Sequence, residues 1–157
     1  MPTAVASPIG LRLARTARAV TQAFERAMAE AGGSAATWQV LVLVRSQEAR
    51  AQARMAEAMG ISGATLTHHL NALEARGLVH RWREASNRRE QHTALTPAGE
   101  DLFHRLRAVA VRHDKRLRSR LTGEETHVLA ELLDKLQAGL QEDAAPVRRP
   151  RRAGPAP

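Results

Sequence analysis

Residues 51–99 decide the fold of this chain, and they begin AQARMAEAMGISGATLTHHLNALEARGLV. The pattern predicts a short helix over residues 52–59, a tight turn at residues 60–62 and a second helix over residues 62–76. A strand from residue 79, a basic loop and a second strand follow. Compact helix-turn-helix units with a hairpin behind them suit the major groove of DNA, with the flanking loop on the backbone or in the minor groove.

Two further helices are predicted on the N-terminal side of this stretch. Apolar residues recur at three- and four-residue steps from residue 8 to residue 31, with Ser7 expected at the N-cap and Pro8 at the first helical position. After Gly32-Gly33, Ser34 is expected to cap a helix over residues 35–46. Its run from residue 38 to residue 44 is too apolar for a surface and predicts the buried centre of the domain.

Two long helices are predicted on the C-terminal side. Thr96 is a suitable N-cap with Pro97 behind it, which opens a helix through about residue 117. Thr122 and Glu125 form a capping box before a last leucine-rich helix. From residue 141 the chain is rich in Pro, Arg and Ala without periodicity, so we expect the segment 141–157 to be a disordered Arg/Pro-rich tail.

The resulting organisation is mainly α, with a small β-hairpin wing. We expect residues 35–96 to form a winged helix-turn-helix DNA-binding region, flanked by a helical dimerisation region made of residues 1–34 and 97–140. The stripes of the flanking helices hold more apolar surface than about 50 central residues can cover, which favours packing against a second copy. A monomer with a larger internal core is the alternative.

Composition excludes several classes of protein. The chain has no cysteine, so a disulfide scaffold, a thiol switch and a Cys-ligated zinc are excluded. It has no apolar run near the roughly 20 residues of a membrane span, and it begins without a signal-peptide pattern, so we expect a cytoplasmic protein and no membrane partner. The seven histidines show no ligand spacing, no catalytic motif is present, and we expect no metal, no cofactor and no enzyme activity.

The net charge of +8 points to a polyanionic partner. Residues 141–157 hold four arginines and two acidic residues, so that segment adds two charges and six remain elsewhere. Arginine outnumbers lysine 22 to 2, however, and this bias could also reflect a GC-rich coding sequence. Charge alone therefore does not decide for nucleic acid.

The second helix of the helix-turn-helix unit has one apolar and one polar face. Leu66, Leu70 and Leu73 lie on the apolar face, which should pack on the preceding helices. The opposite face presents Ala64, Thr67, His68 and Asn71, with Gly63 and Thr65 near the N-terminal end. Small hydroxyl, imidazole and amide side chains let a helix enter a groove about 12 Å wide and bond to base edges. A merely solvated helix face is the alternative.

The hairpin is strongly basic, with its turn predicted at residues 84–89. Five arginines oppose only Glu84 and Glu90 in this part of the chain: Arg76, Arg81, Arg83, Arg88 and Arg89. The tip has no apolar anchor, so only solvent or a ligand would hold the Arg88-Arg89 pair. Arginine there can enter an A·T-rich minor groove, where the potential is most negative.

In residues 8–140 the chain resembles the MarR family (multiple antibiotic resistance regulators) of winged helix-turn-helix repressors. The resemblance rests on residues 55–62, 65–79 and 37–41, and on Asn87-Arg88-Arg89 followed by LTPAG at residues 95–99. It implies a dimer that carries two winged lobes onto a pseudo-palindromic operator in double-stranded DNA. On matching positions, the residues implied to meet the major groove are Ser62, Gly63, Thr65, Thr67, His68 and Asn71.

The predicted wing contacts are Arg83, Asn87, Arg88 and Arg89, of which the resemblance implies Arg88 and Arg89 at the family's minor-groove or phosphate site. The family usually has aspartate where this chain has Asn87, which can hydrogen-bond but cannot form an ion pair. Proteins of this family typically release DNA when a small aromatic or phenolic acid binds, and by position Trp38 and His69 could line that crevice. The alternative is that Trp38 fills core and His69 bonds a local carbonyl.

The sequence thus predicts a dimeric, sequence-specific transcriptional regulator of MarR type, a repressor by resemblance. The competing hypothesis is an architectural DNA-binding protein that uses its arginines without reading bases.

Overall fold

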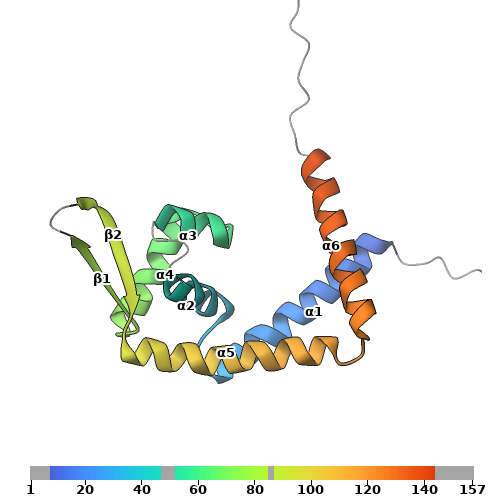
Figure 1. The fold of residues 1–157 in the computed structure, drawn as a ribbon, viewed down its shortest axis with the longest axis horizontal. Helices are drawn as coiled ribbons and strands as arrows, with labels where there is room; N and C mark the ends of the chain where they lie inside the picture. Colours follow the sequence, from blue (N-terminus) through green and yellow to red (C-terminus); the bar gives the residue numbers. More distant parts are fainter. Residues whose placement is uncertain (1–7, 47–51, 85–86, 144–157) are drawn as a thin grey trace, which may run out of the picture. The chain divides into compact units, whose positions relative to one another are not determined.

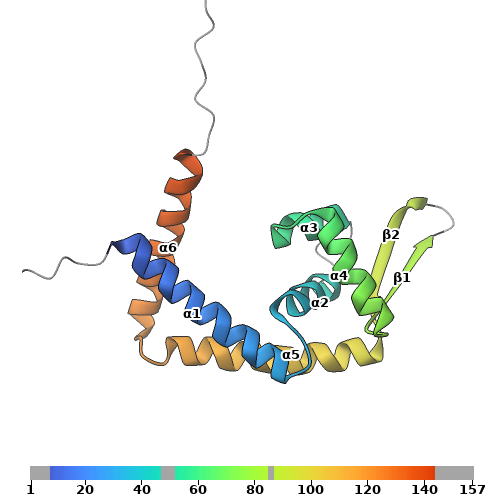
Figure 2. The ribbon, with the colours of Figure 1, turned by 180° about the vertical axis from the view of Figure 1, so that it is seen from behind.

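The computed structural model describes residues 8–46, 52–84 and 87–143, with the side chains of residues 84, 87–90 and 141–143 excepted. The chain divides into two compact units, Met1–Asp114 and Lys115–Pro157. The first contains α1 to α4, the hairpin and most of α5, and the second contains the end of α5 and α6 (Figures 1 and 2). Helices and a two-stranded antiparallel sheet make up the fold, as predicted.

Helix α1 (Ile9–Glu30) and helix α2 (Ala35–Ser46) form close to the predicted bounds. Pro8 occupies the N-cap position of α1 and makes no side-chain cap, so its prediction as first helical residue is wrong, and Ser7 lies outside the described residues. Gly32 adopts a φ of +88°, which ends α1. The Ser34 hydroxyl then accepts a hydrogen bond from the Thr37 amide at 3.0 Å, as predicted for an N-cap.

Helix α3 (Gln52–Met59) and helix α4 (Gly63–Ala75) form the helix-turn-helix. Gly60 turns the chain with a φ of +64°, a conformation that glycine adopts without strain. Ser62 caps α4, because its hydroxyl accepts from the Thr65 amide at 3.1 Å. The predicted helix-turn-helix is therefore confirmed to within one residue at each end.

Helix α2 lies at the centre of the first unit, where it contacts α1, α3, α4 and β2. Its Val40 and Leu41 are fully buried, which confirms the prediction from its apolar run. Helix α4 contributes Leu66, Leu70 and Leu73 to the same core. The remaining buried residues come from both sides of the sequence: Met28, Val44, Met55, Ala56, Leu78, Val79, Leu102, Phe103, Leu106 and Val109.

Strands β1 (Val79–Glu84) and β2 (Asn87–Leu95) pair antiparallel, with Val79 opposite Leu95 and Arg83 opposite Gln91. The register shifts between Arg83 and Glu84, so that Glu84 pairs with Asn87. The predicted turn over residues 84–89 was too long, because β2 already begins at Asn87. Backbone pairing there overrides the polar composition on which that prediction rested.

Helix α5 (Pro97–Arg118) is capped by Thr96. The Thr96 hydroxyl accepts from the Gly99 amide at 3.1 Å and donates to the Gly77 carbonyl at 2.6 Å. Helix α6 (Gly123–Asp143) begins with the predicted capping box. The Thr122 amide donates to the Glu125 carboxylate at 2.8 Å, and the Glu125 amide donates to the Thr122 hydroxyl at 3.2 Å. Hydrogen bonding from the Thr122 amide to the carboxylate, with a further contribution from the Thr122 side chain, lowers the pKa of Glu125.

The apolar side chains of α6 are largely exposed. Six of them are between 42% and 73% accessible: Val128, Leu129, Leu132, Leu133, Leu136 and Leu140. In the first unit, Ile9, Leu11 and Leu13 of α1 are exposed as well. No helix within the described ranges has the length and apolarity needed to cross a membrane. The predicted tail began too early, because residues 141–143 still belong to α6, and residues 144–157 lie outside the described residues.

Candidate nucleic-acid interface

The polar face of α4 is open to solvent. Because Leu66, Leu70 and Leu73 turn into the core, the intervening residues are held on the opposite side. The structure exposes all six residues predicted for this face: Ser62, Gly63, Thr65, Thr67, His68 and Asn71. The helix thus presents short polar side chains on a rigid support, with no large side chain that would keep it out of a groove.

At the start of α4, the hydroxyl groups are partly used within the protein. The Ser62 and Thr65 hydroxyls lie 2.8 Å apart, and the Thr67 hydroxyl donates to the Gly63 carbonyl at 2.9 Å. Thr67 therefore offers an outside ligand its oxygen lone pairs and its methyl group. These are groups that can meet an exocyclic amine or a thymine methyl in the major groove.

Asn71 is connected to the hairpin through Arg81 of β1. The Arg81 Nη2 donates to Asn71 Oδ1 at 2.7 Å, and the Arg81 Nε donates to Glu74 Oε2 at 2.9 Å. A second short contact joins Arg81 Nη2 to the same Glu74 oxygen. The side-chain hydrogen bond from Arg81, reinforced by its charge, lowers the pKa of Glu74 from its usual value.

The hairpin carries the remaining predicted contacts. Arg83 is exposed near the end of β1, whereas Asn87, Arg88 and Arg89 have their backbone in β2 and their side chains outside the described residues. Arg76 donates to the Gly32 carbonyl at 3.0 Å. Two of the five arginines counted for the hairpin, Arg76 and Arg81, therefore already have partners inside the protein.

An aromatic row runs along the hairpin. Trp82 is 39% exposed, and the rings of His80 and His92 stack on it, each with its centroid 5.5 Å away. His92 sits directly opposite Trp82 in the strand register. Sequence reasoning missed this row, although the alternation of His80 and Trp82 along one strand puts both on the same face.

The predicted effector residues lie on different helices. Trp38 of α2 is half-buried and stacks on Phe103 of α5 at 5.3 Å, and the Arg45 guanidinium lies 4.7 Å from the same Phe103 ring. His69 of α4 is half-buried, with its ring 6.2 Å from that of His68. In the described part of the chain no ring contact joins Trp38 to His69, and their role as effector ligands stays a prediction.

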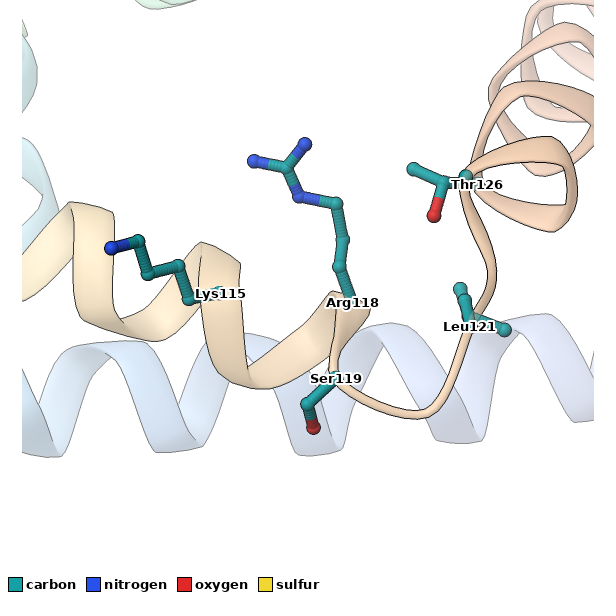
Figure 3. Close-up of a pocket in the computed structure, with 6 residues that line it drawn as sticks. Lys115, Arg118, Ser119, Leu121 and Thr126 are labelled. Carbon is teal, nitrogen blue, oxygen red and sulfur yellow. The ribbon is translucent and has the colours of Figure 1, made fainter.

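A hollow in the second unit lies where α5 ends and α6 begins. Its lining is Lys115, Arg118, Ser119, Leu121, Gly123 and Thr126. Figure 3 shows Arg118 and Thr126 extending into the space between the two helices, whereas Ser119 points to the other side of the connection. The hollow contains neither predicted effector residue. Over the described ranges, no group of three or more His, Asp or Glu could hold a metal ion.

The contact of Arg81 with Glu74 joins the hairpin to α4, and sequence reasoning did not predict it. Both residues were visible as opposite charges seven residues apart, one in a helix and one in the strand behind it. That spacing corresponds to no contact rule of a single helix or strand. The turn at Gly77, with its φ of +66°, brings them together, and this geometry is not readable from local pattern.

Comparison with known proteins matches this region to a family model. The model of the MarR family covers residues 34–91, which include α2, the helix-turn-helix and most of the hairpin. A curated relative from Thauera aromatica, described as a transcriptional regulatory protein for the hcr operon, is 26% identical over 145 residues. That alignment spans 92% of this chain and 87% of the relative.

Solved structures give the same result over a greater length. The transcriptional repressor CouR, solved on a 23-mer DNA duplex, is 30% identical with a TM-score of 0.73. The alignment covers 83% of this chain and 92% of CouR. The MepR–DNA complex of S. aureus superposes with a TM-score of 0.74, covering 85% of this chain and 96% of MepR. At 19% identity it supports the fold alone.

Proposed function

Because this chain belongs to the MarR family, we propose that it is a transcriptional regulator that binds double-stranded DNA as a homodimer. The observation that carries the proposal is the exposed polar face of α4, which stands directly opposite the buried row Leu66, Leu70 and Leu73. The repressor CouR was solved on a DNA duplex, which supports the same activity and the same sign of regulation here.

The proposed contacts divide between two grooves. Ser62, Gly63, Thr65, Thr67, His68 and Asn71 would meet base edges and phosphates of the major groove, because α4 exposes them on one side. Arg83, Asn87, Arg88 and Arg89 would meet the backbone or the adjacent minor groove from the hairpin. A twofold dimer would repeat this set one helical turn away, on a pseudo-palindromic operator.

Residues 1–34 and 97–140 are the proposed dimerisation region, with residues 35–96 as the DNA-binding region. The exposed leucines of α6 support this assignment, since a monomer rarely leaves such a row of large apolar side chains in water. We further propose release by a small aromatic or phenolic effector near Trp38 and His69. A cytoplasmic location belongs to the proposal, because its DNA partner lies there.

Binding of variants to operator and to random DNA tests the proposal. His68→Ala and Asn71→Ala should each weaken operator binding by about 5- to 100-fold while leaving random DNA unchanged, because base contacts carry specificity. Arg89→Ala should weaken both and reduce the slope of log affinity against log salt by about 0.9. Equal losses on both DNAs for all three variants would refute direct base reading.

Footprinting on the DNA upstream of the gene that encodes this chain distinguishes a sequence-specific regulator from an architectural DNA-binding protein. A discrete protected palindrome supports a regulator, whereas uniform coverage supports the architectural protein suggested by the net charge of +8. Adding small aromatic acids to the same reaction tests the effector, since loss of the footprint is the expected result. Trp38→Ala should then make the footprint resistant to the acid.

A further inference from the structure

Arg81 is held too firmly inside the protein to act as a free phosphate-binding cation. Its side chain is only 13% exposed, and it is directed from β1 onto α4. Its Nε and Nη2 both donate to the Glu74 carboxylate, so its charge is already balanced. The Arg81 Nη2 also donates a hydrogen bond to Asn71 Oδ1 at 2.7 Å.

This contact fixes the orientation of the Asn71 amide. A guanidinium has five N–H donors and no acceptor, so the atom of Asn71 that faces Arg81 must be the carbonyl oxygen. The amide nitrogen consequently points away from Arg81. Asn71 is exposed on the polar face of α4, and the group it turns outward is an NH₂ donor with two hydrogens, while the oxygen keeps one lone pair beside Arg81.

The usual contact of asparagine with DNA needs both ends of the amide. In the bidentate pair with adenine, the oxygen accepts from N6 while the NH₂ donates to N7. Because Arg81 occupies one lone pair of the oxygen and holds that oxygen toward β1, the donor half is the part of the amide that stays turned outward. Guanine presents two neighbouring acceptors, N7 and O6, whereas adenine presents a donor beside N7 and cytosine presents a donor alone.

We propose that Arg81 is a positioning residue that fixes the hydrogen-bonding polarity of Asn71, so that Asn71 selects guanine over adenine in the major groove. This inference rests on the proposed function, since it assigns a base preference to one of its contacts. Arg81 itself touches neither base nor phosphate, and Glu74 holds it in place.

Selection from a randomised operator library tests the assignment. The position read by Asn71 is identified as the one whose preference Asn71→Ala abolishes. At that position the wild-type protein should favour guanine over adenine by about fivefold or more, the lower end of what one good base contact provides. Arg81→Met frees the Asn71 oxygen, so in this variant the ratio of guanine to adenine should fall by a similar factor. Arg81→Lys should restore the preference for guanine.

Salt dependence supplies a matched control on the same strand. Arg81→Met should leave the log–log salt slope of the wild type unchanged, because the charge is internally paired. Arg83→Ala, two residues along β1 and exposed, should lower the slope by about 0.9. A loss of that size in Arg81→Met would instead make Arg81 a phosphate contact and overturn the proposal.

Asn71→Asp gives a second route that leaves the fold in place. The carboxylate can still accept from Arg81, but it has no hydrogen to donate, so the preference should move from guanine to a base with an exocyclic amine. A wild-type motif with adenine at this position would overturn the inference alone. A wild-type protein that selects no motif would overturn the proposed function, and this inference with it.

Discussion

Among the described glycines, Gly99 has the least room for a side chain. It is buried in the first turn of α5, where a Cβ atom would lie 1.9 Å from the Leu78 carbonyl oxygen and 3.4 Å from the Leu95 Cβ. The nearest obstacle is backbone, which cannot rotate away as the end of a side chain can. The glycine therefore permits α5 to begin in direct contact with Leu78 and Leu95 at the base of the hairpin.

We predict that Gly99→Ala destabilises the protein by about 3 kcal/mol, because the added methyl group separates α5 from Leu78. The midpoint of urea denaturation measures this, with Gly10→Ala as the control. Gly10 also lies in a helix, but its Cβ would meet nothing within 4 Å. Equal stability of the two variants would show that the α5 start can shift at little cost.

Single residues are also the scale at which the sequence was most informative. Ser34, Thr96 and Thr122 were each predicted as helix caps, and each makes the expected hydrogen bond. The hydrogen bond of a cap joins residues within three positions of one another, so a short stretch of sequence is enough to predict it. The exposed face of α4 was predictable for the same reason, since the leucine spacing fixes it.

At the scale of elements, prediction was less complete. The bounds of α3 and α4 follow from their own residues, but the start of β2 at Asn87 depends on backbone pairing with Glu84 across the hairpin. The partnership of Arg81 with Asn71 and Glu74 likewise joins β1 to α4. Contacts between elements depend on tertiary geometry, and no period in the sequence encodes them.

The Arg81–Glu74 pair predicts a pH-dependent attachment of the hairpin to α4. The hydrogen bond and charge of Arg81 lower the pKa of Glu74 in the folded state. A lowered folded-state pKa means that the stabilisation is fully present above the unfolded value of about 4.3 and is lost as pH falls through the folded value. Glu74→Gln should therefore be less stable than wild type at pH 7, and the difference should vanish at low pH.

Urea denaturation of both proteins at pH 7 and between pH 3 and pH 4 measures this difference. The effect should be small, since Glu74 is 39% exposed and solvent screens the pair. Glu57→Gln is the control, because the Glu57 side chain is exposed on α3 and makes no ion pair with another described residue. A gap between wild type and Glu74→Gln that stayed constant with pH would contradict the assignment.

At the scale of the whole molecule, the apolar surface is the feature that a single chain leaves unexplained. Along α6, Leu129, Leu133, Leu136 and Leu140 recur at three- and four-residue steps, which places them on one side of the helix. All are more than 40% exposed. The sequence predicted this apolar row, and its role in dimerisation stays a prediction, because no pattern in one chain specifies which residues of a second copy would cover it.

We predict that Leu136→Asp raises the dimer dissociation constant by at least about a hundredfold, since an unpaired carboxylate would be placed in an apolar contact. Sedimentation velocity at micromolar concentration should show monomers, and operator affinity should fall with them. Ala138→Asp, on the opposite side of α6, introduces the same charge as a control. Monomers in both variants, or dimers in both, would exclude this row as the interface.

The base of the hairpin, where the segment 78–96 begins and ends, has a consequence for how the wing can differ between related proteins. The Thr96 amide donates to the Leu78 carbonyl at 3.1 Å and its hydroxyl donates to Gly77, so the ends of the segment 78–96 meet at one point. A segment closed in this way can be exchanged as a cassette. Tips of other lengths or charges could be grafted between related proteins, changing what the wing touches while the path of the two adjoining helices stays the same.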